Sequence, residues 1–184
     1  MQGIGLARRK RINKYFILAI SILVFLVLVA VDQLTKLYFR NNYQDGSVVT
    51  IIENFFVFKF AKNTGAAWSL FADKSWSQLF FIILTIVSLI LFILLFVFAY
   101  VKNHRFLQFS IAVVIAGTLG NFLDRVLFGY VTDFISFQFG SYFFPIFNVA
   151  DICLTIGVIM VCVHFIFFDG LNKNSKKRSI SDDN

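Results

Sequence analysis

Cysteine and histidine are scarce in this chain of 184 residues, which has two of each. Cys153 and Cys162 fall nine residues apart on one predicted helix, too far apart along its axis to form a disulfide. His104 and His164 are isolated, so a cluster of metal ligands of the His-Glu-x-x-His kind is not available. No serine or cysteine has an evident basic partner. These shortages argue against a disulfide scaffold, a metal site and a serine or cysteine hydrolase.

Charged residues are also few, at 15% of the chain, whereas 59% of the residues are hydrophobic, 26 are Phe and the mean hydropathy is +0.80. This composition predicts an integral membrane protein. A helix needs about 20 apolar residues to cross a hydrocarbon core of about 30 Å. Four runs are long enough, and we predict helical spans at 15–31, 79–101, 106–123 and 149–168. An even number of spans places both termini on the same side.

The distribution of lysine and arginine predicts which side that is, because basic residues near span ends tend to stay in the cytoplasm. Most of the 17 basic residues precede the first span, separate the second from the third, or follow the fourth. Both termini are therefore predicted to be cytoplasmic. Because these lysines and arginines stand at span ends, membrane topology and anionic lipid explain the net charge of +7, and nucleic-acid binding is not implied. Residues 32–36 stand where a secretory signal would have a small-residue cleavage site, so we interpret the first span as an anchor.

The sequence predicts one domain over residues 1–171, followed by a polar cytoplasmic tail at 172–184. The outward loop at about 41–76 contains two β-prone runs, at 48–52 and 55–60, separated by turn-forming residues. Because Phe-rich strands exposed to water would aggregate, we expect them to form a small sheet on the membrane surface. The predicted fold is an all-α membrane protein of four transmembrane helices, with a small extracytoplasmic β-rich cradle between the first two.

Polar residues interrupt the outer ends of three spans in an otherwise apolar chain: Asp32, Asn121, Asp124, Arg125, Asn148 and Asp151. Burying such residues separately is costly, so we predict one shared polar pocket near the outer leaflet.

Each of these residues also has a simpler structural interpretation. Asp32 and Lys36 have the spacing of a helix-stabilising ion pair, and Asp124 beside Arg125 is typical of an interfacial ion pair. Asn148 is typical of a helix N-cap, which places Asp151 at the third helical position. Gly117, Asn121 and Arg125 share one helix face. We expect that glycine to permit close helix packing, and the two polar residues to hydrogen-bond the loop that contains Asp133.

The strongest indication of chemistry is the pair Asp133 and Asp151, which flank the last span. Two carboxylates about 4 Å apart repel by roughly 4 kcal/mol at an effective dielectric near 20, so such a pair shares a proton. One member then acts as a base that activates water and the other as an acid, as in an aspartic protease. Two alternatives are a small transporter that uses the aspartates as a proton or cation relay and a non-catalytic lipid-binding scaffold.

Five motifs stand in an order that resembles the bacterial lipoprotein signal peptidases, also called signal peptidase II. They are Asp32-Gln33-Leu34-Thr35-Lys36, Asn63-Thr64-Gly65-Ala66-Ala67-Trp68-Ser69, Gly117-Thr118-Leu119-Gly120-Asn121-Phe122-Leu123-Asp124-Arg125, Gly129-Tyr130-Val131-Thr132-Asp133-Phe134-Ile135 and Phe144-Pro145-Ile146-Phe147-Asn148-Val149-Ala150-Asp151. The resemblance covers most of the chain. One departure is Trp68, where Phe is usual in the family, and we expect altered packing and intact activity because both are large aromatics.

The resemblance implies an intramembrane aspartic endopeptidase that removes the signal peptide from prolipoproteins, just before the cysteine that bears a diacylglyceryl group. It assigns catalysis to Asp133 and Asp151. The positions that it implies as supporting or substrate-contacting are Asp32, Lys36, Asn63, Gly65, Asn121, Asp124, Arg125 and Asn148. No metal or organic cofactor is implied. The expected setting is the bacterial cell membrane, with the active site near the outer face. The expected partners are modified prolipoproteins and membrane lipid, and nucleic acid is not expected. The enzyme is expected to be a monomer.

Overall fold

Four long helices and a small sheet make up the protein. The computed structural model describes residues 2–65, 76–140 and 142–169, with side chains over 14–65, 76–140 and 142–167. The elements are α1 (Gln2–Asn42), β1 (Val48–Ile52), β2 (Phe56–Asn63), α2 (Ser77–Lys102), α3 (Arg105–Phe128), β3 (Val131–Phe139), β4 (Tyr142–Phe143) and α4 (Val149–Val163), which continues as a π-helical segment at His164–Asp169. Trp68 and the predicted tail at 172–184 lie outside the described residues.

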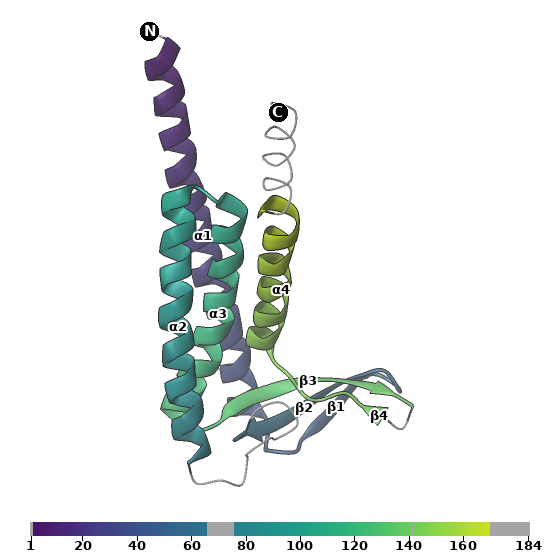
Figure 1. Ribbon diagram of the computed structural model, residues 1–184. Helices are drawn as coiled ribbons and strands as arrows, with labels where there is room; N and C mark the ends of the chain where they lie inside the picture. The colour runs from purple at the N-terminus through teal and green to yellow at the C-terminus, as the bar shows by residue number, and fades with distance from the viewer. Residues whose placement is uncertain (1, 66–75, 141, 170–184) are drawn as a thin grey trace, which may run out of the picture.

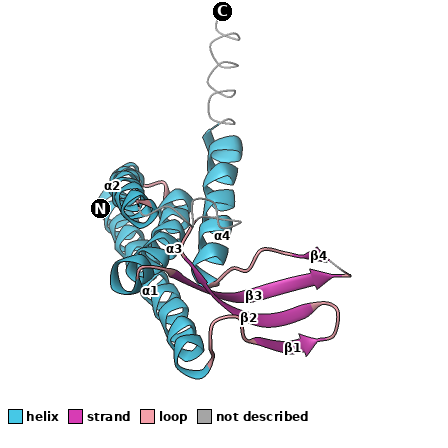
Figure 2. Ribbon diagram, turned by 90° about the horizontal axis from the view of Figure 1, so that it is seen from below, coloured by secondary structure: helices cyan, strands magenta, loops and turns pink. Residues whose placement is uncertain are grey.

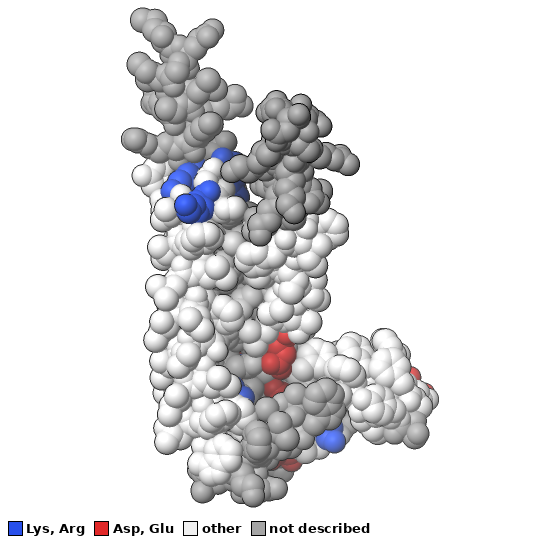
Figure 3. All heavy atoms as spheres, viewed as in Figure 1, with Lys and Arg blue, Asp and Glu red and all other residues white. Residues whose placement is uncertain are grey.

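The helices are long and apolar enough to cross a membrane, over Lys14–Asn42, Ser77–Lys102, Arg105–Phe128 and Val149–Phe167. The predicted four-helix membrane fold is confirmed, and the chain is a multi-pass membrane protein. Helix α3 is central, because 67% of its most apolar window is buried against 6% in α2. Figure 1 shows the start of α1 and the end of α4 at one end of the bundle and the sheet at the other. Figure 3 shows basic side chains at the first end and acidic side chains where bundle and sheet meet.

Helix α1 continues well beyond the predicted end of its span at residue 31. The extension contains Asp32, Lys36 and Arg40, whose charges made the apolar pattern stop early. These side chains are nearly or fully buried against other elements, so the helix continues where hydropathy alone predicts a boundary. Helix α3 also extends beyond its predicted end at residue 123, to Phe128. Gly129 then adopts a φ of 75°, a backbone conformation that favours glycine, and ends the helix.

The sheet is antiparallel in the order β1-β2-β3-β4. Strands β1 and β2 confirm the predicted cradle between the first two helices, but β3 and β4 come from the segment between α3 and α4. Figure 2 shows the four strands extending from one side of the bundle. The expectation that Asp133 lies in a loop was wrong, since it lies on β3 opposite Ala61 of β2. Its backbone is therefore held by a strand partner that is remote in sequence.

Two sets of contacts join these parts. Phe39 of α1, Phe60 of β2 and Phe134 of β3 form a buried cluster, in which the rings of Phe39 and Phe134 stack at 4.3 Å between centroids. This cluster attaches the sheet to the end of α1. Helices α3 and α4 approach closely at Gly117 and Gly157, where an added Cβ would lie within 3 Å of backbone atoms of the other helix. The predicted packing role of Gly117 is therefore confirmed.

Candidate active site

Asp133 is a buried carboxylate held between two side-chain amides. Asn148 Nδ2 donates to its Oδ1 at 2.6 Å, and Asn63 Nδ2 donates to its Oδ2 at 2.9 Å. The side chain is 3% exposed. Burial, and secondarily the negative charge of Asp151, raise the pKa of Asp133 from 3.8 to about 7, against the opposing effect of the two amides. This carboxyl group is therefore able to gain or lose a proton near neutral pH.

Asp151 lies in the first turn of α4 and completes its N-terminal cap. Asn148 Oδ1 accepts the backbone N–H of Asp151 at 3.0 Å, and Asp151 Oδ2 accepts the backbone N–H of Asn148 at 3.1 Å. The predicted N-cap and third helical position are confirmed. Asn121 Nδ2 of α3 donates to the other oxygen of Asp151 at 2.8 Å. The capping role fixes the carboxylate at the helix N-terminus, where the helix dipole favours negative charge.

Both aspartates line one cavity of about 640 Å³ at the junction of sheet and bundle. Its polar lining also includes Asn63, Asn121 and Arg125. Its apolar lining comes from β4, the segment before α4, and α4 itself, including Phe144, Pro145, Ile146 and Leu154. A cavity with two carboxylates, a few polar groups and an apolar wall is of the kind that binds a largely apolar substrate. The structure thus brings Asp133 and Asp151 together, although 18 residues separate them in sequence.

Asn148 and Asn121 connect the two carboxylates. Asn148 is fully buried, and its Nδ2 also donates to Asn121 Oδ1 at 3.1 Å. Asn121 Oδ1 in turn accepts from Lys36 Nζ at 2.9 Å. The two asparagines therefore form a hydrogen-bonded bridge from the carboxylate of β3 to that of α4. Because both amides use their oxygen and nitrogen atoms, each aspartate is held in one orientation.

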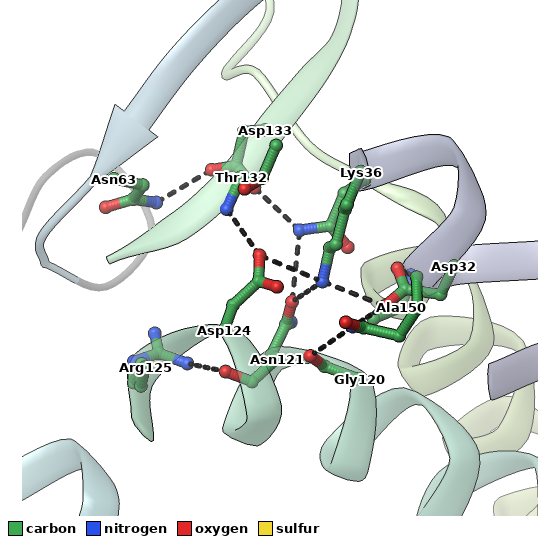
Figure 4. A network of polar contacts seen from close by, with 12 residues as sticks. Asp32, Lys36, Asn63, Gly120, Asn121, Asp124, Arg125, Thr132, Asp133 and Ala150 are labelled. Atoms are coloured by element: carbon green, nitrogen blue, oxygen red, sulfur yellow. Dashed lines mark hydrogen bonds and ion pairs between the residues drawn. The ribbon is translucent and has the colours of Figure 1, made fainter. Parts of the chain in front are cut away.

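A chain of alternating charges lies behind this bridge (Figure 4). Lys36 Nζ is 2.9 Å from Asp32 Oδ2 and 3.6 Å from Asp124 Oδ2, and Asp124 Oδ1 is 3.1 Å from Arg40 Nη1. The predicted pair of Asp32 with Lys36 is confirmed, but it is buried and does more than stabilise α1. Asp32 Oδ1 accepts the N–H of Ala150 at 2.9 Å and so ties α1 to the start of α4.

Arg125 does not pair with its neighbour, contrary to the expectation of an Asp124–Arg125 ion pair. Its Nη2 donates to the carbonyl of Gly65 at 3.3 Å, and its guanidinium carbon lies 5.2 Å from the ring centroid of Phe81. Gly65 N in turn donates to Asn63 Oδ1 at 3.0 Å. Arg125 therefore holds the segment after β2 beside the cavity.

The prediction that Asn121 and Arg125 hydrogen-bond the segment that contains Asp133 was also wrong. Asn121 binds Lys36, Asn148 and Asp151 instead. The segment is held through Asp124, whose Oδ2 accepts the N–H of Thr132 at 2.8 Å. All ten residues singled out in the sequence nevertheless gather in or beside this network.

Sequence reasoning missed Arg40, Thr132 and Gln33, which also belong to the network. Arg40 follows Asp32 and Lys36 at intervals of four residues, so its helical spacing already indicated a shared face. Gln33 Nε2 donates to the carbonyl of Gly120 at 3.1 Å. Gln33 and Thr132 stand within the family motifs, but their roles could not be predicted, because the contacts that define them are with residues of other elements. Among the described residues, no three His, Cys, Asp or Glu side chains are grouped as a metal site.

Comparison with known proteins gives the same family as the motifs. The sequence matches the family described as Signal peptidase (SPase) II over residues 24–167. It is 37% identical over 156 residues to the lipoprotein signal peptidase of Listeria welshimeri, covering 84% of this chain and 97% of the relative. It is 40% identical over 165 residues to that of Staphylococcus aureus, covering 90% and 98%.

A solved structure described as a bacterial membrane enzyme, determined by the in meso method at 2.3 Å resolution, is also similar. Its TM-score is 0.70 at 38% sequence identity, with 80% of this chain and 88% of that chain covered. The sequence match extends over all four spans, and the fold agrees with that of a membrane enzyme. This chain therefore belongs to the signal peptidase II family of membrane peptidases.

Proposed function

We propose that this protein is an intramembrane aspartic endopeptidase that removes the signal peptide from prolipoproteins, cutting just before the cysteine that bears a diacylglyceryl group. Family membership supports the substrate class, because the relatives in Listeria and Staphylococcus are named lipoprotein signal peptidases. The observation that carries the mechanism is the convergence of Asp133 and Asp151 on one cavity. The apolar wall of that cavity suits a substrate with acyl chains.

In the proposed reaction the two aspartates act as a coupled pair that holds one proton near neutral pH, in keeping with the raised pKa of Asp133. The ionised carboxylate accepts a proton from a water molecule, whose oxygen attacks the scissile carbonyl carbon. The protonated carboxyl donates a hydrogen bond to the carbonyl oxygen as negative charge develops there. The C–N bond then breaks, a proton moves to the leaving nitrogen, and a carboxylic acid and an amine are formed.

The surrounding polar residues would orient this pair and the substrate. Asn148 and Asn63 hold Asp133, and Asn121 holds Asp151, so neither carboxylate has to reorganise during the reaction. Arg125 and Asn63 line the cavity and are the proposed substrate contacts, with Gly65 held by Arg125. The remaining members of the predicted site, Asp32, Lys36 and Asp124, support the bridge from behind.

The proposed orientation has both termini in the cytoplasm and the sheet at the outer face of the bacterial cell membrane. The basic side chains at the end of the bundle away from the sheet support it. Lys14, Lys102 and Arg105 stand at the corresponding ends of three spans. The active site then lies near the outer leaflet. We propose a single peptidase domain over residues 1–171 that acts as a monomer, with membrane lipid and modified prolipoproteins as its partners.

The test is cleavage of a diacylglyceryl-modified prolipoprotein by the purified protein in detergent. We expect wild type to cut before the lipidated cysteine, and Asp133→Asn and Asp151→Asn each to lose about 10²–10⁴-fold in kcat. Glu53→Gln, an exposed carboxylate in the turn between β1 and β2, is the matched control and should cut normally. Circular dichroism and size-exclusion chromatography show whether each variant is folded.

Two outcomes would contradict the proposal. An inactive but folded wild type would remove the peptidase assignment, and normal cleavage by either aspartate variant would remove the paired mechanism. The relay alternative is then tested by proton flux into liposomes that contain the protein. One observation argues against a relay, which needs charged groups along a path through the bilayer. Among the described residues, the buried Asp, Lys and Arg side chains all lie in the network at the sheet end; they are Asp32, Lys36, Asp124 and Asp133.

A further inference from the structure

Arg40 is the last member of the chain of alternating charges, and it contacts Thr132 of the sheet. Asp32, Lys36 and Arg40 follow each other at four-residue intervals on α1, and Asp124 of α3 forms ion pairs with both Lys36 and Arg40. Arg40 is 11% exposed and Asp124 is fully buried. Two carboxylates and two cations make this buried cluster electrically neutral, and each charge has a partner of opposite sign.

Arg40 also contacts three elements at once. From α1, its Nη1 reaches Asp124 of α3 at 3.1 Å and Thr132 Oγ1 of β3 at 3.0 Å. Its guanidinium carbon lies 4.2 Å from the ring centroid of Phe128, at the end of α3. A guanidinium group can form these contacts together because it is planar, has several fixed donors and stacks on aromatic rings. Arg40 thus joins α1, α3 and β3 through one side chain.

The residue that Arg40 and Asp124 hold is the neighbour of the proposed catalytic aspartate. Asp124 Oδ2 accepts the backbone N–H of Thr132 at 2.8 Å, while Arg40 donates to the Thr132 side chain. Thr132 is fully buried. Successive residues of a strand direct their side chains to opposite faces, so fixing the Thr132 side chain toward Asp124 and Arg40 directs Asp133 toward the amides of Asn63 and Asn148.

We propose that Arg40 is a positioning residue of the peptidase. It fixes the position of Asp133 by binding the neighbouring Thr132, and it keeps the cluster of Asp32, Lys36 and Asp124 electrically neutral. This inference rests on the proposed function, since it presumes that Asp133 is catalytic. Arg40 is absent from the described lining of the cavity. Its action is therefore on the catalytic carboxylate through β3, and not on the substrate.

The charge of Arg40 matters because several ionisable groups surround Asp133. Asp151 of α4 acts on it with negative charge, whereas Lys36 of α1 and Arg125 of α3 act with positive charge. Without Arg40, Asp124 keeps only Lys36, and the cluster acquires one net negative charge. A negative charge nearby disfavours an ionised carboxylate, so protons would leave the aspartate pair at higher pH.

The experiment compares Arg40→Met and Arg40→Lys with wild type in the prolipoprotein cleavage assay across pH, with Lys102→Met at the far end of the bundle as control. For Arg40→Met we expect kcat about 10- to 100-fold lower, KM nearly unchanged, and both limbs of the pH profile about one unit higher. For Arg40→Lys we expect the wild-type pH profile, because the charge is kept, and an intermediate kcat, because the planar contacts are lost. Lys102→Met should behave as wild type.

A purely structural role would lower the thermal stability and the yield of folded protein while leaving kcat and the pH profile of the folded fraction unchanged. That result, or wild-type kcat in Arg40→Lys where Arg40→Met does not fold, would overturn the inference. Failure of the proposed function is recognised separately. In that case folded wild type does not cleave, or Asp133→Asn cleaves normally, whatever Arg40 does.

Discussion

Replacing Asp133 by Asn should lower kcat about 10²–10⁴-fold and yet improve stability relative to wild type as the pH rises. In the folded protein burial raises the pKa of Asp133 from 3.8 to about 7, so its carboxyl group takes up a proton on folding anywhere between these values. A raised folded-state pKa contributes stability at low pH that is lost as the pH rises through about 7. Above that pH the folded state has to hold a buried carboxylate beside Asp151. Asn at this position has no charge at any pH.

The size of the effect follows from the same values. Between pH 5 and pH 8 the unfolded chain has this group ionised throughout, while the folded protein releases its proton at about pH 7. Two units at about 1.4 kcal/mol each give a loss of about 3 kcal/mol in the free energy of unfolding of wild type. For a chain of this size, that corresponds to about 6–12 °C in Tm. The group is 3% exposed, so solvent screens this effect little.

The assay is thermal unfolding in detergent of wild type, Asp133→Asn and the exposed control Glu53→Gln at both pH values. The quantity of interest is how the difference in Tm between each variant and wild type changes with pH. This comparison cancels the pH-independent loss of the hydrogen bond from Asn63, whose amide would face another amide. The difference should grow by about 6–12 °C for Asp133→Asn and stay constant for the control. A constant difference for Asp133→Asn would refute the claim that this group binds a proton on folding.

Three further variants test the network behind the aspartates. Lys36→Met should lower stability by about 3–5 kcal/mol, because it leaves Asp32 without its cation and Asp124 with only one, and chemical unfolding measures this loss. Asn148→Ala should cost about 1–2 kcal/mol for the helix cap alone and should lower kcat in the cleavage assay, because the amide that joins the two carboxylates is lost. Gly120→Ala should reduce Tm, since the added Cβ would lie 3.0 Å from Asp32 Cγ. Retained wild-type behaviour in any of them would contradict the assigned contact.

The membrane fold could be predicted from the sequence because apolar length and rare charge are local properties. The runs at 79–101 and 149–168 coincide with helices to within a few residues. The first span was predicted too short, because hydropathy counts a charged residue as polar whether or not that residue is paired inside the protein. Asp32, Lys36 and Arg40 are paired inside the protein, and only the partners on α3 and α4 reveal it.

The candidate site could be predicted as a set of residues but not as an arrangement. Asp133 and Asp151 stand out because carboxylates beside a span are rare, and the capping box of Asn148 with Asp151 is a pattern of four consecutive residues. The amide bridge through Asn121 joins residues 27 and 30 positions apart, and such pairings leave no local signature. The structure alone showed that Arg125 turns away from Asp124 toward Gly65.

By itself the sequence determined four membrane helices, a β-rich cradle and a concentration of polar residues at one end of the bundle, because each of these depends on the composition of a short stretch. Tertiary structure decided that Asp133 lies on a strand, that β3 joins a sheet begun before α2, and that Arg40 and Thr132 belong to the network. The contacts of Arg40 with Asp124 and Thr132 join positions 84 and 92 residues apart. Which distant residues meet is fixed by how helices and strands pack, and this packing is a property of the whole chain.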